Sequence, residues 1–63
     1  MNELNSKMNE MMQTLIATAV DVEKFEQGNK SAGTRIRKAM QEIKNLAQEV
    51  RVEVQEIKNS ELV

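Results

Sequence analysis

The chain has 63 residues and a formal net charge of −1, and it contains no Cys, His, Pro, Trp or Tyr. A chain this short forms one small domain of marginal stability, and without Cys or His neither disulfides nor common metal sites can stabilise it. Association with another chain remains as the means of stabilisation.

The same composition excludes most chemistry. No nucleophile is paired with a base and no Gly-rich loop follows a strand, so we expect no enzyme, no metal, no cofactor and no small-molecule substrate. The longest mostly apolar run, residues 15–20, is far shorter than the roughly 20 residues of a membrane span. No secretory signal is evident, and the absence of Cys fits a reducing compartment. We therefore predict a cytoplasmic protein that does not cross a membrane.

Apolar residues in the first half follow a helical period and predict a helix over about residues 3–27. The main row alternates steps of four and three, with a gap at Thr18, as in the seam of a coiled coil. Its members are Leu4, Met8, Met11, Leu15, Val22 and Phe25. A second row, one position along, contains Met12, Ile16 and Ala19. An apolar face this wide needs two neighbouring helices to cover it.

A turn is predicted at residues 28–30. Gly28 suits the left-handed backbone just after a helix end, and Asn29 tolerates similar angles. Either Ser31 or Thr34 can cap the following helix through its hydroxyl, and Ser31 gives the shorter loop.

The second half predicts a helix over about residues 31–60. Its main row repeats every seven residues and is flanked by a second row. The main row contains Ile36, Ala39, Ile43, Leu46, Val50 and Ile57, and the second contains Met40, Ala47 and Val54. Residues 50–54 alternate as a strand would, but they lie inside a longer heptad pattern, so we interpret them as helix with Val52 exposed.

These elements predict an all-α fold, an antiparallel helical hairpin. The second apolar row of each helix remains exposed to solvent unless another hairpin covers it. We therefore expect a homodimer that forms a four-helix bundle of the coiled-coil type. The residues predicted to form the core and the dimer contact are Leu15, Ile16, Val22, Phe25, Ile36, Met40, Ile43, Leu46, Val50 and Ile57.

Cations are concentrated near the turn. Residues 28–41 contain Lys30, Arg35, Arg37 and Lys38 and no acid, whereas the rest of the chain has five cations against ten acids. Arginines beside a helix N-terminus can bind phosphate, and no aromatic residue interleaves with them for base stacking. We expect these side chains to point into solvent, either contacting phosphates without strong sequence preference or forming an ordinary solvated face.

A basic line also runs down the second helix at a seven-residue spacing. It contains Arg37, Lys44, Arg51 and Lys58, and a parallel acidic line contains Glu42, Glu49 and Glu56. Adjacent lines of opposite charge are typical of coiled-coil flanks, so we assign this line a structural role.

Residues 24–39 carry the run Gly-Asn-Lys-x-Ala-Gly-Thr-Arg-x-Arg-Lys-Ala. This run resembles bacterial linker-histone-like proteins, the family typified by the chlamydial histone-like nucleoid protein, and the likeness extends with weaker constraint to about residue 60. The resemblance implies binding of double-stranded DNA and chromosome organisation in the cytoplasmic nucleoid. It implicates Lys30, Arg35, Arg37 and Lys38, with Gly28 and Gly33 shaping the turn.

Members of that family known for condensing DNA carry a long Lys- and Ala-rich tail, whereas this sequence ends at Val63. The resemblance is therefore to a tailless member. Two hypotheses follow: a nucleoid-associated DNA-binding dimer that uses its basic turns, or a structural oligomerisation module whose apolar rows and Val52 recognise another protein.

Overall fold

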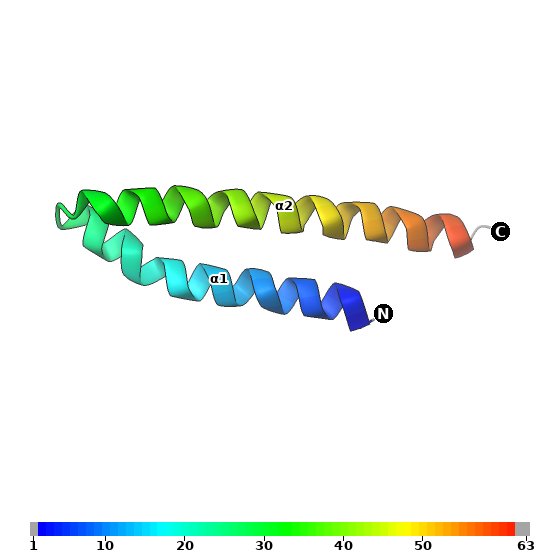
Figure 1. Cartoon of the computed structure of the whole chain (residues 1–63). Coiled ribbons are helices and arrows are strands. Elements are labelled where there is room, and N and C mark those ends of the chain that lie inside the picture. The colour runs from blue at the N-terminus through cyan, green and yellow to red at the C-terminus, as the bar shows by residue number, and fades with distance from the viewer. Residues whose placement is uncertain (1, 62–63) are drawn as a thin grey trace.

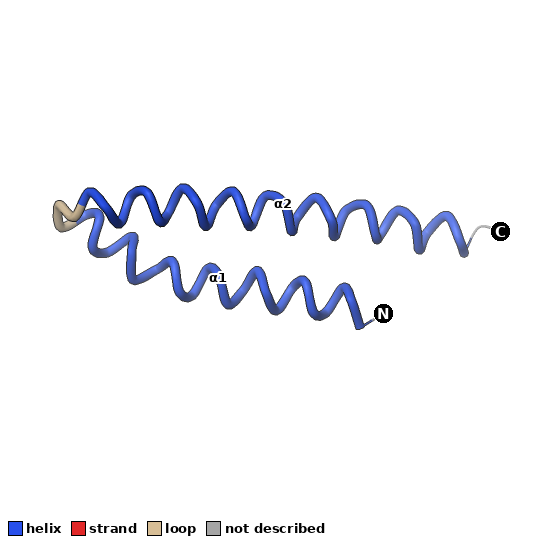
Figure 2. The backbone as a smooth tube through the Cα atoms, in the orientation of Figure 1, coloured by secondary structure: helices blue, strands red, loops and turns tan. Residues whose placement is uncertain are grey.

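The protein folds as two helices joined by a tight turn, in a computed structural model that describes residues 2–61. Helix α1 spans Asn2–Glu26 and helix α2 spans Lys30–Glu61. The helices pack side by side as a hairpin, and no strand occurs in the described part of the chain (Figures 1 and 2). The predicted all-α hairpin is confirmed, and α2 continues without a break through residues 50–54.

The hairpin is a thin rod with principal extents of 54 × 15 × 11 Å. Its radius of gyration of 15.4 Å exceeds the roughly 10.6 Å typical of a compact domain of this length. Figure 1 shows α2 running on past the start of α1, so the two helices are open at the end opposite the turn, here called the open end. A single layer of two helices encloses little: Ala32 and Leu46 are the buried apolar residues of the described part.

The end of α1 is closed by backbone hydrogen bonds around Gly28. The Asn29 N–H donates to the Lys24 carbonyl at 3.0 Å, and the Gly28 N–H donates to the Phe25 carbonyl at 2.9 Å. This is the Schellman arrangement, which needs a left-handed residue just after the helix. Gly28 supplies it with a φ of 104°, and a Cβ added there would meet no atom within 4 Å. The glycine is therefore required for its backbone angle and not for space.

The same Asn29 begins the second helix. Its Oδ1 accepts hydrogen bonds from the Ala32 N–H at 3.3 Å and from the Ser31 hydroxyl at 2.7 Å. Asn29 is thus the N-cap of α2, and the prediction of Ser31 or Thr34 as the cap was wrong. One residue ends the turn and caps the next helix, so the loop is shorter than either alternative allowed.

Helix α1 turns a different side toward α2 than its apolar pattern predicted. Met8, Leu15, Val22 and Phe25 were expected in the seam, yet each is about half exposed. Half-buried or buried positions on α1 recur instead at Leu4, Lys7, Met11, Thr14, Thr18 and Asp21. Thr18, read as a gap in the pattern, is only 6% exposed.

Three of the polar side chains in this seam have partners. The Thr18 hydroxyl donates to the Thr14 carbonyl within α1 at 2.6 Å, which satisfies it despite its burial. Lys7 and Asp21 each pair with a charge on α2. On α2 the main apolar row does face α1, with Leu46 buried and Ile36, Ile43, Val50 and Ile57 half-buried.

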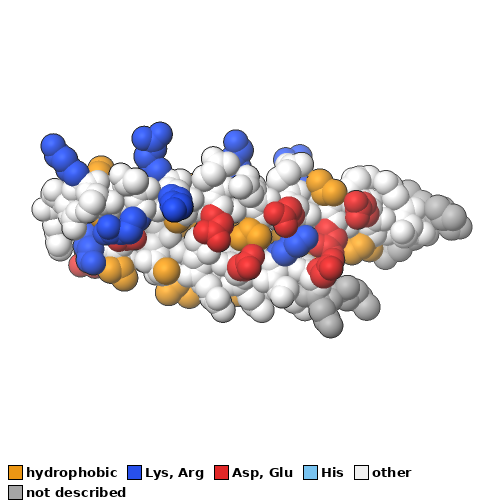
Figure 3. Space-filling view, in the orientation of Figure 1, with side chains coloured by type: hydrophobic (Ala, Val, Ile, Leu, Met, Phe, Trp, Pro, Cys, Tyr) orange, Lys and Arg blue, Asp and Glu red, His pale blue; other side chains and the backbone are white. Residues whose placement is uncertain are grey.

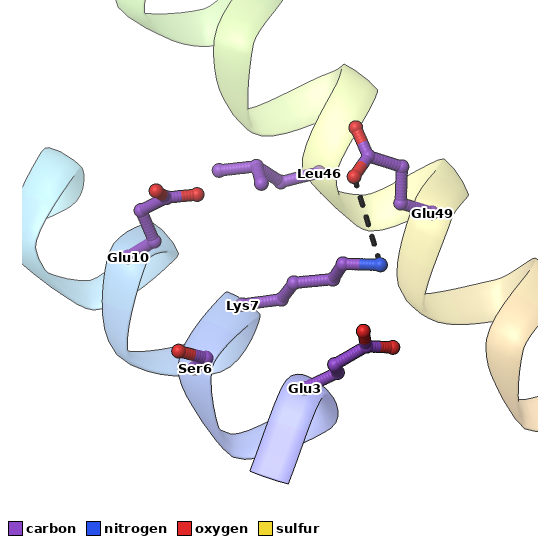
Figure 4. A pocket seen from close by; sticks show the side chains of 6 residues that line it. All are labelled: Glu3, Ser6, Lys7, Glu10, Leu46 and Glu49. Carbon is purple, nitrogen blue, oxygen red and sulfur yellow. Dashed lines mark ion pairs between the residues drawn. The ribbon is translucent and has the colours of Figure 1, made fainter.

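Lys7 ties the two helices together near the open end. Its Nζ lies 3.2 Å from Glu53 Oε2. The same Nζ lies 3.7 Å from Glu49 Oε1, and Figure 4 marks this second pair. The hydrogen bond from Lys7 lowers the pKa of Glu53 and, reciprocally, raises the pKa of Lys7. Figure 4 shows the Lys7 side chain reaching from α1 toward α2, beside Leu46.

Candidate nucleic-acid interface

The turn end is where exposed cations gather. Figure 3 shows Lys and Arg side chains over the turn end and along the outer edge of α2, with acidic side chains clustered toward the open end. Lys30 is the first residue of α2, and Arg35, Arg37 and Lys38 follow within its next two turns. All four are exposed, and the first turn of α2 contains no acid to neutralise them.

The sequence predicted that Arg35 points into solvent, but in the structure Arg35 contacts α1. Its Nε and Nη2 each lie 2.9 Å from Asp21 Oδ1 on α1, and its side chain is 49% exposed. The pair joins α1 and α2 near the turn, so Arg35 has a structural role in the hairpin in addition to any contact with a ligand. Asp21 was missed by the sequence reasoning, although its spacing from Lys7 and Thr14 marks one continuous row.

The other three cations are free of such pairing. Within residues 3–60, Lys30, Arg37 and Lys38 have no carboxylate oxygen within the 4.0 Å of an ion pair. Helical spacing places Lys30 and Arg37 on one edge of α2, and Lys38 on the other side of its outward surface. Lys30 lies in the first turn of α2, where a cation opposes the helix dipole at about 0.3–1 kcal/mol. Helix stability therefore does not explain the presence of Lys30 here.

A shallow groove of about 520 Å³ lies beside these cations. Val22, Phe25 and Ile36 line its apolar part, and Lys30 and Arg37 border it. Gly33, which the resemblance assigned to shaping the turn, lies inside α2, where a Cβ would come within 2.7 Å of the Phe25 ring. Its role is to let that ring rest on the backbone of α2.

The basic line of α2 begins one heptad before Arg37. Lys30 precedes Arg37 by seven residues, so five cations share one edge of the helix at a constant spacing: Lys30, Arg37, Lys44, Arg51 and Lys58. All five are exposed. The acids of the parallel line lie on the other flank of the seam, where Glu49 contacts Lys7.

Comparison with known proteins identifies the family of this chain. The model of the family described as Histone H1-like protein Hc1 matches residues 2–60. The chain belongs to the Hc1 family. The resemblance inferred from the run around the turn is therefore confirmed, and the match also includes α1. Neither the curated proteins nor the solved structures contain a significant match to this Hc1-family chain.

Two further observations concern residues 2–61 of this Hc1-family chain. Neither helix is long and apolar enough to cross a membrane. No group of three or more acidic residues in this region is arranged to hold a metal ion.

Proposed function

We propose that this chain is a non-enzymatic, nucleoid-associated protein that binds double-stranded DNA. The family match over residues 2–60 carries the proposal, because the matched family is histone-like. In this proposal the contact is made by the turn and the start of α2, through Lys30, Arg35, Arg37 and Lys38. Nucleoid localisation is what the family implies.

The chemistry of the turn end supports phosphate contact without base readout. Three of the four cations are exposed and lack an ion-pair partner in the described part of the chain. Phe25, the one aromatic residue, rests against Gly33 in the groove that Lys30 and Arg37 border, and one ring does not make a row of platforms on which successive bases stack. Contacts to phosphates alone give affinity with little sequence preference.

The proposal includes self-association as a homodimer. The chain exposes 5256 Å², whereas a compact monomer of its mass exposes only about 4,100 Å². Many of the exposed side chains are large and apolar, and a second hairpin would cover them to complete a four-helix bundle.

DNA binding is tested by a salt titration with charge-reversed variants. If four cations per site neutralise phosphates, log affinity falls with log salt at a slope of about −3.6. Arg37→Glu combined with Lys38→Glu leaves the Arg35–Asp21 pair intact and is expected to abolish binding to duplexes of any sequence. Lys44→Glu with Arg51→Glu is the matched control, because it makes the same charge change farther along the same helix. We expect it to weaken binding far less.

The proposal fails if the unaltered chain does not bind duplex DNA at about 50 mM salt and tens of micromolar protein, where non-specific binding is strong. It also fails if both double variants lose affinity equally, because the turn would then be no more important than the rest of α2.

The alternative is a structural oligomerisation module that binds another protein. The exposed apolar side chains favour it, including Val52, which is 46% exposed. A stoichiometric protein partner that survives nuclease treatment, together with no retention on DNA cellulose, would establish this alternative.

A further inference from the structure

We infer that two copies pack with their turns at the same end, with α2 of each copy beside α1 of the other. The inference rests on the proposed self-association, and its consequence, that both basic turns form one DNA-contacting surface, rests on the proposed DNA binding. The packing itself is argued from the faces and edges of the hairpin.

The exposed apolar rows of both helices lie on one face of the hairpin. On α1 they follow the seam by one residue, as Met8 follows Lys7 and Leu15 follows Thr14. On α2 the row of Met40, Ala47 and Val54 follows the seam residues Ala39, Leu46 and Glu53 by the same step. In antiparallel helices an equal step from the seam leads to the same side of the pair. The groove shared by Val22, Phe25 and Ile36 shows this common face at the turn end.

This apolar face is large enough to bind a second copy. It contains Met8, Met12, Leu15, Ile16, Val22, Phe25, Met40 and Val54, which are between 40% and 72% exposed. Together these side chains expose on the order of 800 Å², which is about what each partner buries in a standard protein interface. Between residues 8 and 22 the only charged residues are Glu10 and Asp21, and neither lies on this face. The face is therefore uncharged along residues 8–22 of α1 and extends along the hairpin. Such a surface can pack against the same surface of a second copy.

The two edges of the apolar face carry opposite charge. The α2 edge contains only cations: Lys30, Arg37, Lys44, Arg51 and Lys58. By helical spacing, the α1 edge is polar but neutral at Asn5 and Asn9, apolar at Met12 and Ile16, and acidic near the turn, at Glu23 and Glu26. Both of these acids are exposed.

Two symmetric arrangements bring the apolar faces together. If the two-fold axis crosses the rod, the turns lie at opposite ends and each α2 lies beside the other α2, so that ten cations line one edge of the bundle. If the axis runs along the rod, the turns lie together and each α2 lies beside α1 of the other copy. Lys30 and Arg37 then lie at the level of the partner's Glu23 and Glu26. Like charges in direct apposition destabilise an interface, so the second arrangement is favoured.

This arrangement gives the dimer one basic end. Residues 21–41 contain five cations and three acids, a net charge of +2 per chain, and the remaining residues carry −3. Two turns together bring +4 to one end of the bundle, so the dimer contacts a single duplex with that end. With the turns apart, the same cations would be divided between two ends and would bridge two duplexes.

Distances between spin labels test the arrangement, and the absence of native Cys allows labelling at a single position. Ser31→Cys places a label near the turn, and Gln48→Cys places one near the middle of α2. With the turns together, both labels give distances between copies of roughly 30 Å or less, the width of a four-helix bundle with its labels. With the turns apart, the Ser31 distance is about 50 Å, because Ser31 lies roughly 24 Å along α2 from the middle of the rod.

A short distance at both positions supports the inference. A short Gln48 distance with a Ser31 distance near 50 Å overturns the arrangement but leaves the dimer, and no measurable distance at Gln48 overturns the dimer itself. No DNA is present, so a failure of DNA binding in the salt titration remains a separate result.

Charge reversal at the edge gives a second test. Glu23→Lys with Glu26→Lys is expected to weaken dimerisation about five- to tenfold, because it places cations beside Lys30 and Arg37 of the partner. Lysines at the end of α1 suit the helix dipole, so the hairpin itself is not impaired. Adding Lys30→Glu and Arg37→Glu is expected to restore dimerisation. An unchanged dimer constant in the first variant would contradict the arrangement.

Discussion

The side of α1 that meets α2 and the side that faces solvent are built from different residues. The inner side combines Leu4 and Met11 with Lys7, Thr18 and Asp21, whose polar groups are held by ion pairs and a local hydrogen bond. The outer side contains methionines, Leu15, Ile16 and Val22 at 41–72% exposure. On this helix the inner side is therefore mixed in character, and much of the apolar surface lies on the outer side. The hairpin is closed by its turn, by the apolar row of α2 and by specific polar pairs, while much of the apolar surface of α1 faces solvent.

The magnitudes of these interactions support that division of roles. Exposed ion pairs contribute about 0.2–1 kcal/mol each, so the three in the hairpin stabilise it modestly. Burying a Leu, Ile, Val or Met side chain completely contributes about 1.5–3 kcal/mol. Covering the exposed halves of eight such side chains therefore contributes more than these ion pairs do. The five variants below test this comparison, beginning with the largest expected effect.

A charge in the outer face should have the largest effect. Met12 is 52% exposed, so Met12→Glu is harmless in an isolated hairpin. In a dimer it buries a carboxylate in an apolar contact, and we expect dimer affinity to fall at least about 100-fold. Sedimentation equilibrium measures this change. Val52→Glu is the control, since Val52 lies on α2 away from the outer face, and equal weakening by both variants would contradict our placement of the interface.

Gly28 tests whether the turn holds the hairpin. Gly28→Ala forces an L-residue into a φ of 104°, and we expect it to lower the free energy of unfolding by about 1–2 kcal/mol. Urea unfolding at fixed protein concentration measures the change. Gly33→Ala is the comparison: there the cost is displacement of the Phe25 ring, which is 50% exposed, and alanine favours the helix. A larger loss at Gly33 than at Gly28 would refute this account of the turn.

Removal of the helix cap should have the next largest effect. Asn29→Ala leaves the Ala32 N–H without its side-chain acceptor, and we expect a loss of about 1 kcal/mol in the free energy of unfolding. Ser31→Ala removes only the hydroxyl that donates to Asn29, so a smaller loss is expected. If Ser31→Ala costs as much as Asn29→Ala, the cap has been assigned to the wrong residue.

Thr18 tests the polar character of the seam. Thr18→Val keeps the shape of a side chain that is 6% exposed and replaces a hydroxyl bonded only within its own helix. We expect the free energy of unfolding to rise by no more than about 1 kcal/mol. Thr34→Val, on the exposed side of α2, is the control and should change little. A marked loss at Thr18 would show that its hydroxyl contributes more than a local bond.

The ion pair of Lys7 and Glu53 at the open end should have the smallest effect. It should appear as a dependence of thermal stability on pH. Because Lys7 lowers the pKa of Glu53 below its ordinary value of 4.5, the pair stabilises the fold above that pH. That stabilisation is lost as the pH falls through the lowered pKa. Lys7→Met should reduce the decline of thermal stability between neutral and acidic pH. Glu10→Gln is the control, since Glu10 lies beside Lys7 without being paired to it, and it should leave the decline unchanged.

The sequence predicted the hairpin because heptad spacing and Gly28 are local signals. It did not predict which side of α1 would face α2. The apolar pattern of α1 is about two rows wide. Its main row could therefore face either α2 or a helix of another chain, and the pattern alone does not distinguish the two. The pairs of Lys7 and Asp21 with residues of α2 depend on the rotation of both helices, which spacing within one helix does not specify.

In the candidate site, too, the sequence pattern did not predict contacts between the two helices. The four cations near the turn were evident from composition, and their exposure followed from the predicted helix. The pairing of Arg35 with Asp21 was not evident, because it joins residues 14 positions apart on different helices. Asn29 was considered as a turn residue, and its second role as a cap emerged only from the shortness of the loop.

The central claim is that this hairpin is half of a dimer. Sedimentation equilibrium of the unaltered chain at micromolar concentration tests it most directly. We expect a particle of twice the 7.2 kDa chain mass, with unfolding that shifts to higher temperature as the concentration rises. A species of single-chain mass that unfolds cooperatively and independently of concentration would contradict the account.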